Sequence, residues 1–211
     1  PSLGDGMKVL PVVPLFHVNA WGLPYAAPLT GTSLIFPGPK LDGASLFDLM
    51  DQENVNSAWG VPTVWLGLLE EIRKQERVPS QFQNVVIGGS AAPKSMIEEF
   101  ESLGITVCHA WGMTEMSPVG TQGFLPGSMK KALSQDEQIS KKCYQGRRVF
   151  GVDLKIVDEN DNSLPHDGIA SGELYVRGNA IISGYYKNNE ATEEAFDKEG
   201  WFGTGDIASI T

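Results

Sequence analysis

Hydrophobic positions along this chain follow two alternating periods. Short apolar runs of strand length recur through the first half of the sequence, at 8–16, 32–36, 55–60, 84–89 and 105–112. Between them, apolar residues recur at helical spacing in three segments, 43–54, 62–75 and 93–104. Strands that alternate with helices of about a dozen residues are typical of right-handed βαβ units. The pattern therefore predicts an α/β fold with a parallel sheet covered by helices on both faces.

The pattern changes after Val149. Three later segments alternate apolar and polar residues as half-exposed strands do, at 150–158, 171–178 and 200–210. The first two are joined by residues 159–168, which are rich in Asp, Asn, Pro and Gly. This alternation, with the turn-rich connection, predicts a small antiparallel or barrel-like β subdomain. We therefore expect an α/β subdomain over 1–145 and a β-rich subdomain over 146–211, with a polar surface helix within 127–148.

No charged residue occurs between Lys8 and Lys40, a stretch long enough to suggest a membrane span. The stretch contains six prolines and three glycines, which would break a helix crossing a bilayer. We expect instead a buried strand followed by segments that line an interior or a pocket. No basic region precedes an apolar core near the start, so the sequence predicts no secretory signal.

Composition and charge narrow the class of partner. With 41% hydrophobic and 20% charged residues in 211, the chain has the composition of a globular protein. Sixteen basic against 26 acidic residues give a formal charge of −10, and no basic cluster suits a nucleic acid. Cys108 and Cys143 are too few for a disulfide framework, and with three scattered histidines they form no zinc-ligand spacing. A reducing, cytoplasmic location fits best, with peripheral membrane attachment left open.

Candidate chemistry lies first at the stretch GGSAAP, residues 88–93, which follows a predicted strand. Its two glycines allow a ligand to approach the main chain closely, and Pro93 is suited to open a helix. A tight strand-to-helix turn without a ligand explains the same residues.

The second candidate is HAWGMTEMSP, residues 109–118. Thr114 offers a hydroxyl to a phosphate oxygen, Glu115 a hard oxygen ligand to Mg²⁺, and Trp111 a flat face to a purine. The alternative is a capped helix start with Thr114 and Glu115 in its first turn.

The third candidate is GWFGTGDIA, residues 200–208, which formally contains the glycine pattern of dinucleotide-binding loops. The residues that follow favour a strand over a helix, so the dinucleotide interpretation is disfavoured. Asp206 remains a carboxylate able to accept two ribose hydroxyls, or one that caps a turn.

Together these stretches resemble the acyl-adenylate-forming superfamily (AMP-binding enzymes), and most closely its medium- and long-chain fatty-acyl-CoA synthetases. The resemblance covers nearly the whole chain and rests on five stretches in order. They are PLFHVNAWG (14–22), GGSAAP (88–93), HAWGMTEMSP (109–118), GELYVRGNAIISGYY (172–186) and GWFGTGDIA (200–208).

The resemblance implies a nucleotide site. Trp111 would border the adenine, Thr114 would bond the α-phosphate and Glu115 would help hold Mg²⁺. Asp206 would hold the ribose hydroxyls. The other residues implied at the nucleotide are Gly88, Gly89, Ser90, Ala91, Ala92, Pro93, His109, Ala110, Gly112 and Met113.

The resemblance also implies an acyl site. His17 matches a position beside the acyl carboxylate, where it would join Thr114 and Glu115 in the catalytic group. Without the resemblance, His17 reads as a core histidine. The residues implied to line the acyl tunnel, besides His17, are Val18, Asn19, Trp21, Gly22, Gly60, Val61, Pro62 and Thr63. Small and apolar residues around Trp21 and Gly60 favour a medium or long acyl chain over acetate.

The implied activity is that of an acid–thiol ligase using ATP, Mg²⁺ and coenzyme A as cofactors and co-substrates. The fatty-acid carboxylate and ATP would give acyl-AMP and pyrophosphate, and coenzyme A would then form the thioester. The expected partners are these small molecules, without nucleic acid or a transmembrane segment, and the parent enzyme is compatible with a homodimer.

Two departures from the family pattern limit what the chain itself is expected to do. Many relatives have tyrosine where Trp111 stands. The Ser/Thr/Gly-rich phosphate loop with its lysine is not found, so it would lie upstream of Pro1, and the small C-terminal domain would follow Thr211. The chain is thus interpreted as the middle of a synthetase and expected to be inactive alone. Adenylation for another acceptor, and a nucleotide- or acyl-binding module without catalysis, remain alternatives.

Overall fold

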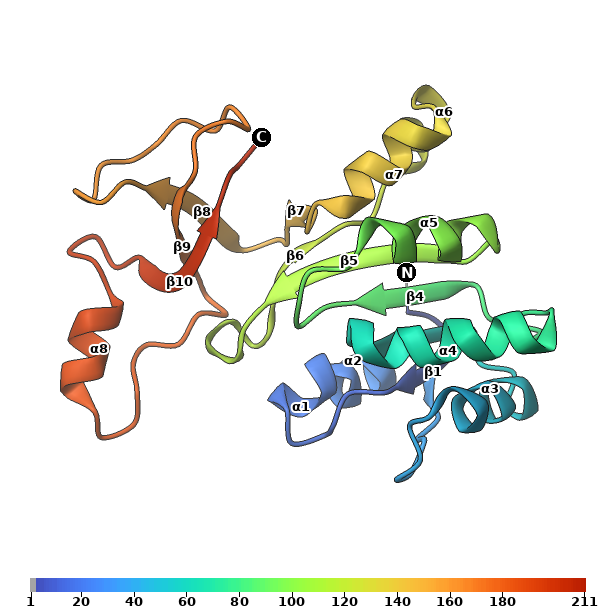
Figure 1. Cartoon of the computed structure of the whole chain (residues 1–211). Helices are drawn as coiled ribbons and strands as arrows, with labels where there is room; N and C mark the ends of the chain where they lie inside the picture. Colours follow the sequence, from blue (N-terminus) through green and yellow to red (C-terminus); the bar gives the residue numbers. More distant parts are fainter. Residues whose placement is uncertain (1–2) are drawn as a thin grey trace. The chain divides into compact units, whose positions relative to one another are not determined.

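The computed structural model describes residues 3–211, which form two compact units (Figure 1). The first unit runs through Thr114 and resumes over Pro118–Arg147. The second consists of Glu115–Ser117 and Arg148–Thr211.

A seven-stranded sheet forms the centre of the first unit, in the order β2-β1-β3-β4-β5-β6-β7. The strands are β1 (Lys8–Pro11), β2 (Ser33–Leu34), β3 (Ser57–Gly60), β4 (Asn84–Ile87), β5 (Thr106–Gly112), β6 (Val119–Gln122) and β7 (Arg147–Arg148). The first five strands of this order pair in parallel, whereas β6 returns antiparallel to β5. The predicted α/β class is confirmed, but the sheet is mixed and not parallel throughout.

The helices of this unit connect and follow the strands. They are α1 (Val18–Trp21), α2 (Leu23–Thr30), α3 (Gly43–Gln52), α4 (Pro62–Gln75), α5 (Lys94–Ser102), α6 (Gly127–Ala132) and α7 (Gln135–Cys143). The bounds of α4 are those predicted from the sequence, with Pro62 in the first turn, where its missing N–H leaves no bond unmade. None of the helices in residues 3–211 has the length and apolar character needed to cross a membrane.

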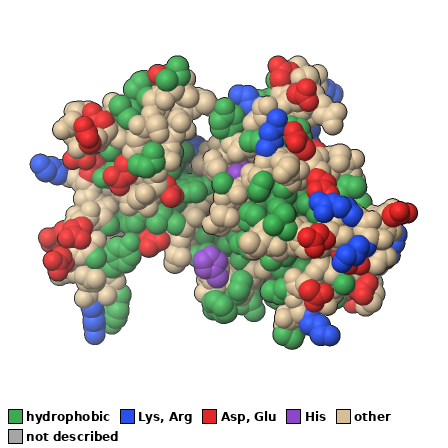
Figure 2. Space-filling model, in the orientation of Figure 1, with side chains coloured by type: hydrophobic (Ala, Val, Ile, Leu, Met, Phe, Trp, Pro, Cys, Tyr) green, Lys and Arg blue, Asp and Glu red, His purple; other side chains and the backbone are tan. Residues whose placement is uncertain are grey.

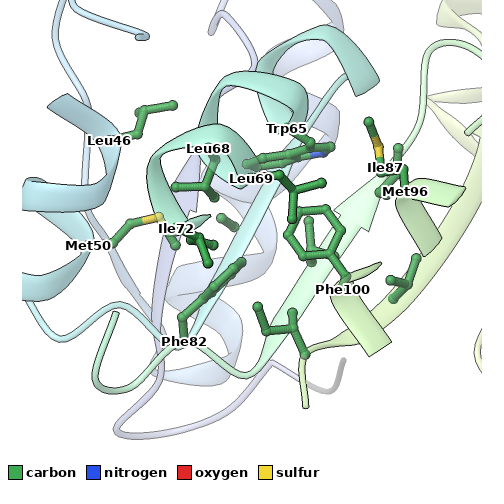
Figure 3. Close-up of a cluster of buried hydrophobic side chains, with 14 of the residues drawn as sticks. Leu46, Met50, Trp65, Leu68, Leu69, Ile72, Phe82, Ile87, Met96 and Phe100 are labelled. Carbon is green, nitrogen blue, oxygen red and sulfur yellow. The ribbon is translucent and has the colours of Figure 1, made fainter. Parts of the chain in front are cut away.

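The main hydrophobic core lies where α3, α4 and α5 pack against the sheet (Figure 3). Trp65 of α4 and Phe100 of α5 are fully buried there, together with Leu10 and Ile87 from the strands. Burying an aliphatic or aromatic side chain of this size contributes about 1.5–3 kcal/mol. This core fixes the positions of β3, β4 and β5, whose carboxyl ends carry the predicted site residues.

A buried ion pair joins α7, α5 and β5. The ammonium of Lys142 donates to the carboxylate of Glu101, and the side chain of Lys142 is only 1% exposed. The same carboxylate oxygen accepts the main-chain N–H of Val107 at 2.6 Å. Burial lowers the pKa of Lys142, while the hydrogen bond and charge of Glu101 act in the opposite direction. One carboxylate thus satisfies both a buried cation and a strand N–H on β5.

The backbone of α1 is a single left-handed turn. All four of its residues have positive φ, from 42° at Val18 to 56° at Trp21, and Gly22 follows at 78°. Each non-glycine residue in this conformation costs about 1–2 kcal/mol, and a β-branched residue such as Val18 is the least suited to it. The turn was not predicted, and its strain is concentrated in the stretch assigned to the acyl site.

The second unit contains a three-stranded antiparallel sheet in the order β10-β9-β8. The predicted small antiparallel β subdomain is thereby confirmed. Its elements are β8 (Val152–Val157), β9 (Gly172–Gly178), α8 (Asn189–Ala195) and β10 (Phe202–Ala208). The indole ring of Trp201 lies beside the cations of Lys155 and Arg177, at 4.9 and 4.3 Å from its centroid. Because the GTGDIA segment lies within β10, the dinucleotide-loop interpretation is excluded.

Charged side chains of both signs are interspersed on the face shown in Figure 2, where Lys and Arg do not gather into a basic patch.

Replacing Glu101 by Ala should destabilise the chain by about 3–5 kcal/mol, because it leaves the buried Lys142 ammonium and the Val107 N–H without their acceptor. The matched variant Lys142→Met should cost less than half as much, because Glu101 keeps the N–H bond and partial access to water. Urea denaturation of the two variants measures both losses. Equal losses would show that the carboxylate does not have this double role.

Asn19 tests the left-handed turn without a change in packing, since its side chain is exposed. Asn19→Val should lower stability by about 1–2 kcal/mol, whereas Asn19→Gly should stay within about 0.5 kcal/mol of the parent. Thermal denaturation followed by circular dichroism gives the comparison. If valine and glycine proved equally stable at this position, the turn would not be left-handed in solution.

Candidate functional site

The carboxyl ends of β4 and β5 lie side by side. Ile87 at the end of β4 is in parallel register with His109 of β5. The GGSAAP loop leaves β4 directly after Ile87, while β5 continues to Gly112. Ligands of α/β sheets bind at the carboxyl ends of strands, so the fold brings two predicted nucleotide motifs to the appropriate edge.

The main chain of the GGSAAP loop is held close to its neighbours. A Cβ atom on Gly88 would lie 3.1 Å from the indole of Trp21 and 3.2 Å from the carbonyl oxygen of Ala110. On Gly89, whose φ is +78°, it would lie 3.1 Å from a methyl group of Val61. Two residues predicted for the acyl tunnel, Trp21 and Val61, therefore pack directly against the predicted adenosine loop.

The end of β5 turns sharply at Gly112. A Cβ atom there would lie 1.9 Å from the carbonyl oxygen of Pro118, so only glycine fits. That oxygen accepts the N–H of Met113 at 3.0 Å and closes the turn into β6. Thr114 is exposed and begins a short 3₁₀ helix (η1, Thr114–Met116). The structure therefore has a short helical turn that contains Thr114 and Glu115, as the alternative interpretation expects. Thr114 is nevertheless accessible to a ligand.

The loop after β3 contributes the other acyl candidates. Pro62 and Thr63 begin α4, Val61 is its N-cap residue, and the indole N–H of Trp65 donates to the carbonyl of Gly60 at 3.2 Å. A Cβ atom on Gly60 would lie 2.8 Å from that indole ring. Gly60 therefore lets Trp65 pack beneath this loop.

His17 precedes the left-handed turn and is exposed, so the structure does not bury it as a core histidine. Its main-chain N–H donates to the carbonyl of Pro14 at 3.0 Å. The turn that follows carries Val18, Asn19, Trp21 and Gly22. Of these four, Trp21 is the one that reaches Gly88 and Gly89.

In the second unit, Glu115 has a partner that the sequence did not identify. The hydroxyl of Tyr185 donates to the Glu115 carboxylate at 3.1 Å, and the Glu115 carbonyl accepts the N–H of Ile182 at 2.9 Å. Partial burial, followed by the interaction with Glu115, raises the pKa of Tyr185, which stays a hydrogen-bond donor at neutral pH. Its position in the quoted GYY sequence is the signal that could have identified it.

The carboxylate of Glu115 is chemically suited to Mg²⁺. This ion is commonly bound through one or two carboxylates together with waters and substrate phosphates. Among residues 3–211 there is no group of three His, Cys, Asp or Glu side chains placed to hold a metal on its own. A metal at Glu115 would therefore take its other ligands from a nucleotide and from water.

Asp206 is exposed at an irregularity in β10. The pairing of β10 with β9 shifts register between Gly203 and Ile207. Gly205 has φ of +73°, and the Asp206 N–H donates to the Thr204 hydroxyl at 3.1 Å. Such bulges reorient side chains at the edges of sheets, so the irregularity gives Asp206 a direction that a regular strand would not.

Neither free cysteine is suited to act as a nucleophile. Burial raises the pKa of the Cys108 thiol, and partial burial raises that of Cys143. Both thiols are therefore protonated at neutral pH, when a thiolate would be required.

The predicted residues form two groups, each described within its own unit. The first unit holds the GGSAAP loop, residues 109–114 and the acyl candidates. The second holds Glu115 and Asp206. Their roles toward nucleotide, metal and acyl chain stay predictions.

Curated relatives match this chain over almost its full length. It is 47% identical over 203 residues to a medium-chain-fatty-acid–CoA ligase of Ectopseudomonas oleovorans, covering 96% of this chain and 36% of the relative. It is 45% identical over 203 residues to a 3-methylmercaptopropionyl-CoA ligase of Ruegeria lacuscaerulensis, covering 96% and 37%. The chain thus spans little more than a third of the length of these relatives.

A solved structure has the same fold. The N-terminal domain of FACL13 from Mycobacterium tuberculosis superposes with a TM-score of 0.82 at 24% identity, covering all of this chain and 50% of that one. The family model described as "AMP-binding enzyme" matches residues 2–186. This chain therefore belongs to the AMP-binding enzyme family.

Proposed function

We propose that this chain forms the nucleotide- and acyl-binding part of an ATP-dependent fatty-acid–CoA ligase. The observation that carries the proposal is the packing of Trp21 and Val61 against Gly88 and Gly89. Adenylation requires the carboxylate of the acid to meet the α-phosphorus of ATP, so the acyl and adenosine surfaces must adjoin. Family membership and two similar CoA ligases support the same reaction class.

The reaction proceeds in two displacements. A carboxylate oxygen of the acid attacks the α-phosphorus of ATP, and the bond to pyrophosphate breaks to leave acyl-AMP. The thiol of coenzyme A then attacks the acyl carbon, loses its proton and displaces AMP. Positioning and charge neutralisation contribute most to such phosphoryl chemistry, since little covalent help from the protein is needed.

Each residue of the site has a proposed task. The main chain of Gly88–Pro93 borders the adenosine, Trp111 borders the adenine, and Asp206 accepts the ribose hydroxyls. Thr114 donates to an α-phosphate oxygen, where negative charge develops in the transition state. Glu115, oriented by Tyr185, would hold Mg²⁺, which supplies charge neutralisation to the phosphates when bound.

The acyl chain is proposed to lie along the surface made by the α1 turn and the loop after β3. Trp21 and Val61, which belong to this surface, lie directly against Gly88 and Gly89 of the loop. A medium or long chain is favoured, and His17 is proposed to lie near its carboxylate. The similarity to a ligase for a short thioether acid makes chain length a property to be measured with a panel of acids.

The same surfaces suit two other functions, adenylation for a different acceptor and nucleotide or acyl binding without catalysis. The two free cysteines fit a reducing, cytoplasmic setting for any of them. Pyrophosphate release followed by acyl transfer to coenzyme A, or to another thiol, distinguishes the three.

The direct test is calorimetric titration of the 211-residue chain with AMP. We expect weak binding, with a Kd in the high-micromolar to millimolar range, about 4–6 kcal/mol. Asp206→Ala should weaken AMP binding about tenfold or more, because a charge-assisted hydrogen bond contributes roughly 1.5–3 kcal/mol. The matched control Asp153→Ala, an exposed carboxylate on β8 outside the proposed site, should bind as the parent does. Absence of AMP binding, or equal loss in the control, would contradict the proposal.

In the full-length protein that carries this segment, Glu115→Ala should lower kcat for adenylation about 10²- to 10³-fold, because charge in the transition state would be less compensated. Tyr185→Phe, which removes only the hydroxyl that orients this carboxylate, should have a smaller effect and should raise the Mg²⁺ concentration needed for half-maximal rate. Pyrophosphate release at varied Mg²⁺ gives both values. A Glu115→Ala enzyme within threefold of the parent would rule out the proposed metal role.

A further inference from the structure

The side chain of His109 lies behind the GGSAAP loop and not on the open surface. The residue is 1% exposed and is held on β5 between two neighbours. It is in register with Ile87 of β4, and its carbonyl accepts the N–H of Gly123 at 2.7 Å. The main chain at His109 is therefore held on both sides, which fixes the point from which the imidazole extends.

The imidazole is bonded to the loop through its Nε2 atom. The main-chain N–H of Ala92 donates to Nε2 at 3.3 Å. A peptide N–H can only donate, so Nε2 must carry a lone pair, and the proton of the neutral ring must be on Nδ1. This bond links residues 17 positions apart, one in each predicted nucleotide motif.

The Nδ1 atom is buried, and no hydrogen bond satisfies it within the described part of the chain. The main-chain carbonyls of Cys143, Lys142 and Ser90 lie close enough to favour a charged ring, but none bonds Nδ1 with good geometry. A buried polar atom without a partner is unusual and calls for an explanation. Within the described residues, the ring nitrogen that has a hydrogen-bond partner is Nε2, and the bond joins it to the loop.

The Ala92 bond adds a hydrogen bond between the two confined ends of the loop, where Ala92 is partly buried against the hydrophobic core. Gly88 and Gly89 at its start are confined by Trp21 and Val61. Pro93 at its end is the N-cap residue of α5. Between them, Ala92 is held by the histidine on the neighbouring strand.

We propose that His109 is a positioning residue, which in its neutral form ties the Gly88–Pro93 loop to β5 and so sets the affinity of the loop for a nucleotide. The affinity part of this inference rests on the proposed function. His109 acts through Ala92 and does not itself need to touch the ligand.

The contact is sensitive to pH because only one protonation state allows it. Burial lowers the pKa of His109 below its ordinary value, so the ring is neutral at pH 7. When the ring is protonated, Nε2 carries a proton and can no longer accept the Ala92 N–H, so the hydrogen bond is lost. The stabilisation is therefore complete above pH of about 6.5 and is lost as the pH falls through the lowered pKa.

Other titratable groups on the elements around the ring are Cys108 on β5, Lys142 and Cys143 on α7, and Lys94, Glu98, Glu99 and Glu101 on α5. Both thiols have raised pKa values, and the Lys142 ammonium is paired with Glu101. The carboxylates of α5 are unchanged in a His109 variant, so a pH effect on this loop that disappears with the imidazole is assigned to His109.

The experiment compares His109→Gln with His109→Leu in the 211-residue chain. Glutamine places an amide oxygen near the position of Nε2, whereas leucine keeps bulk without an acceptor. Without nucleotide at pH 7, amide exchange of residues 88–92 should be about tenfold faster in the leucine variant and within about threefold of the parent in the glutamine variant, because a lost hydrogen bond shifts local opening by about this factor. AMP affinity should fall in the same order.

The pH profile separates positioning from general stability. In the parent, amide exchange at residues 88–92, corrected for its intrinsic pH dependence, should accelerate as the pH falls below 6.5, and both variants should lose this response. Unchanged exchange in the leucine variant, or a pH response that persists in both variants, would overturn the inference. If the leucine variant does not fold, the parent and the glutamine variant decide by the pH response alone. If the exchange rates of the parent and the variants are as expected but the parent does not bind AMP, the result would instead count against the proposed function.

Discussion

The parallel pairing of β4 with β5 is the constraint on which the rest of the site depends. Their register places Ile87 beside His109, so that the loop leaving one strand lies against the end of the other. Side chains of these strands pack in the core that contains Trp65 and Phe100. A shift in register by one residue would turn those side chains away from the core, so the core fixes the register. Because register is set by the core, the site inherits its geometry from packing that no ligand touches.

Close main-chain approach is the second feature of the site, and it follows from the first. Once the two strand ends adjoin, the space above Gly88 and Gly89 is filled by Trp21 and Val61, which leaves little room for a side chain. Trp21 reaches that position through the left-handed turn of α1, at a cost in backbone strain. Strain held by surrounding packing is typical of functional positions, where geometry is maintained against local preference.

Much of the fold could be predicted because the residues that start and end helices agreed with the spacing of the apolar residues that face the core. Helix α4 carries Pro62 at its start and a regular apolar face, and the predicted bounds match those observed. Helix α2 was not predicted, because Pro24 and Pro28 were weighed only against a helix crossing a bilayer and the stretch was expected to line an interior or a pocket. Pro24 lies in the first turn of α2, where proline is tolerated. The antiparallel return of β6 was missed because the close contact of Gly112 with Pro118, and not the composition of a four-residue strand, determines it.

The candidate residues of the site could be named from the sequence by their type, but their hydrogen-bond partners could not. Glycines, a threonine and carboxylates at strand ends indicated a ligand site, and the quoted motifs indicated its class. Nothing in the sequence indicated that His109 would bond Ala92 or that Tyr185 would bond Glu115, since each pair is distant along the chain. Such contacts depend on the register of whole strands, which only the folded structure supplies.

We propose that the adjoining ends of β4 and β5 form a nucleotide-binding surface. Hydrogen exchange of the 211-residue chain with and without saturating AMP, followed peptide by peptide, tests it most directly. With AMP bound, we expect slower exchange in peptides covering 88–93 and 110–114, and no change in α3 or on the outer face of α4. Protection elsewhere in the first unit, with none in these two segments, would contradict it.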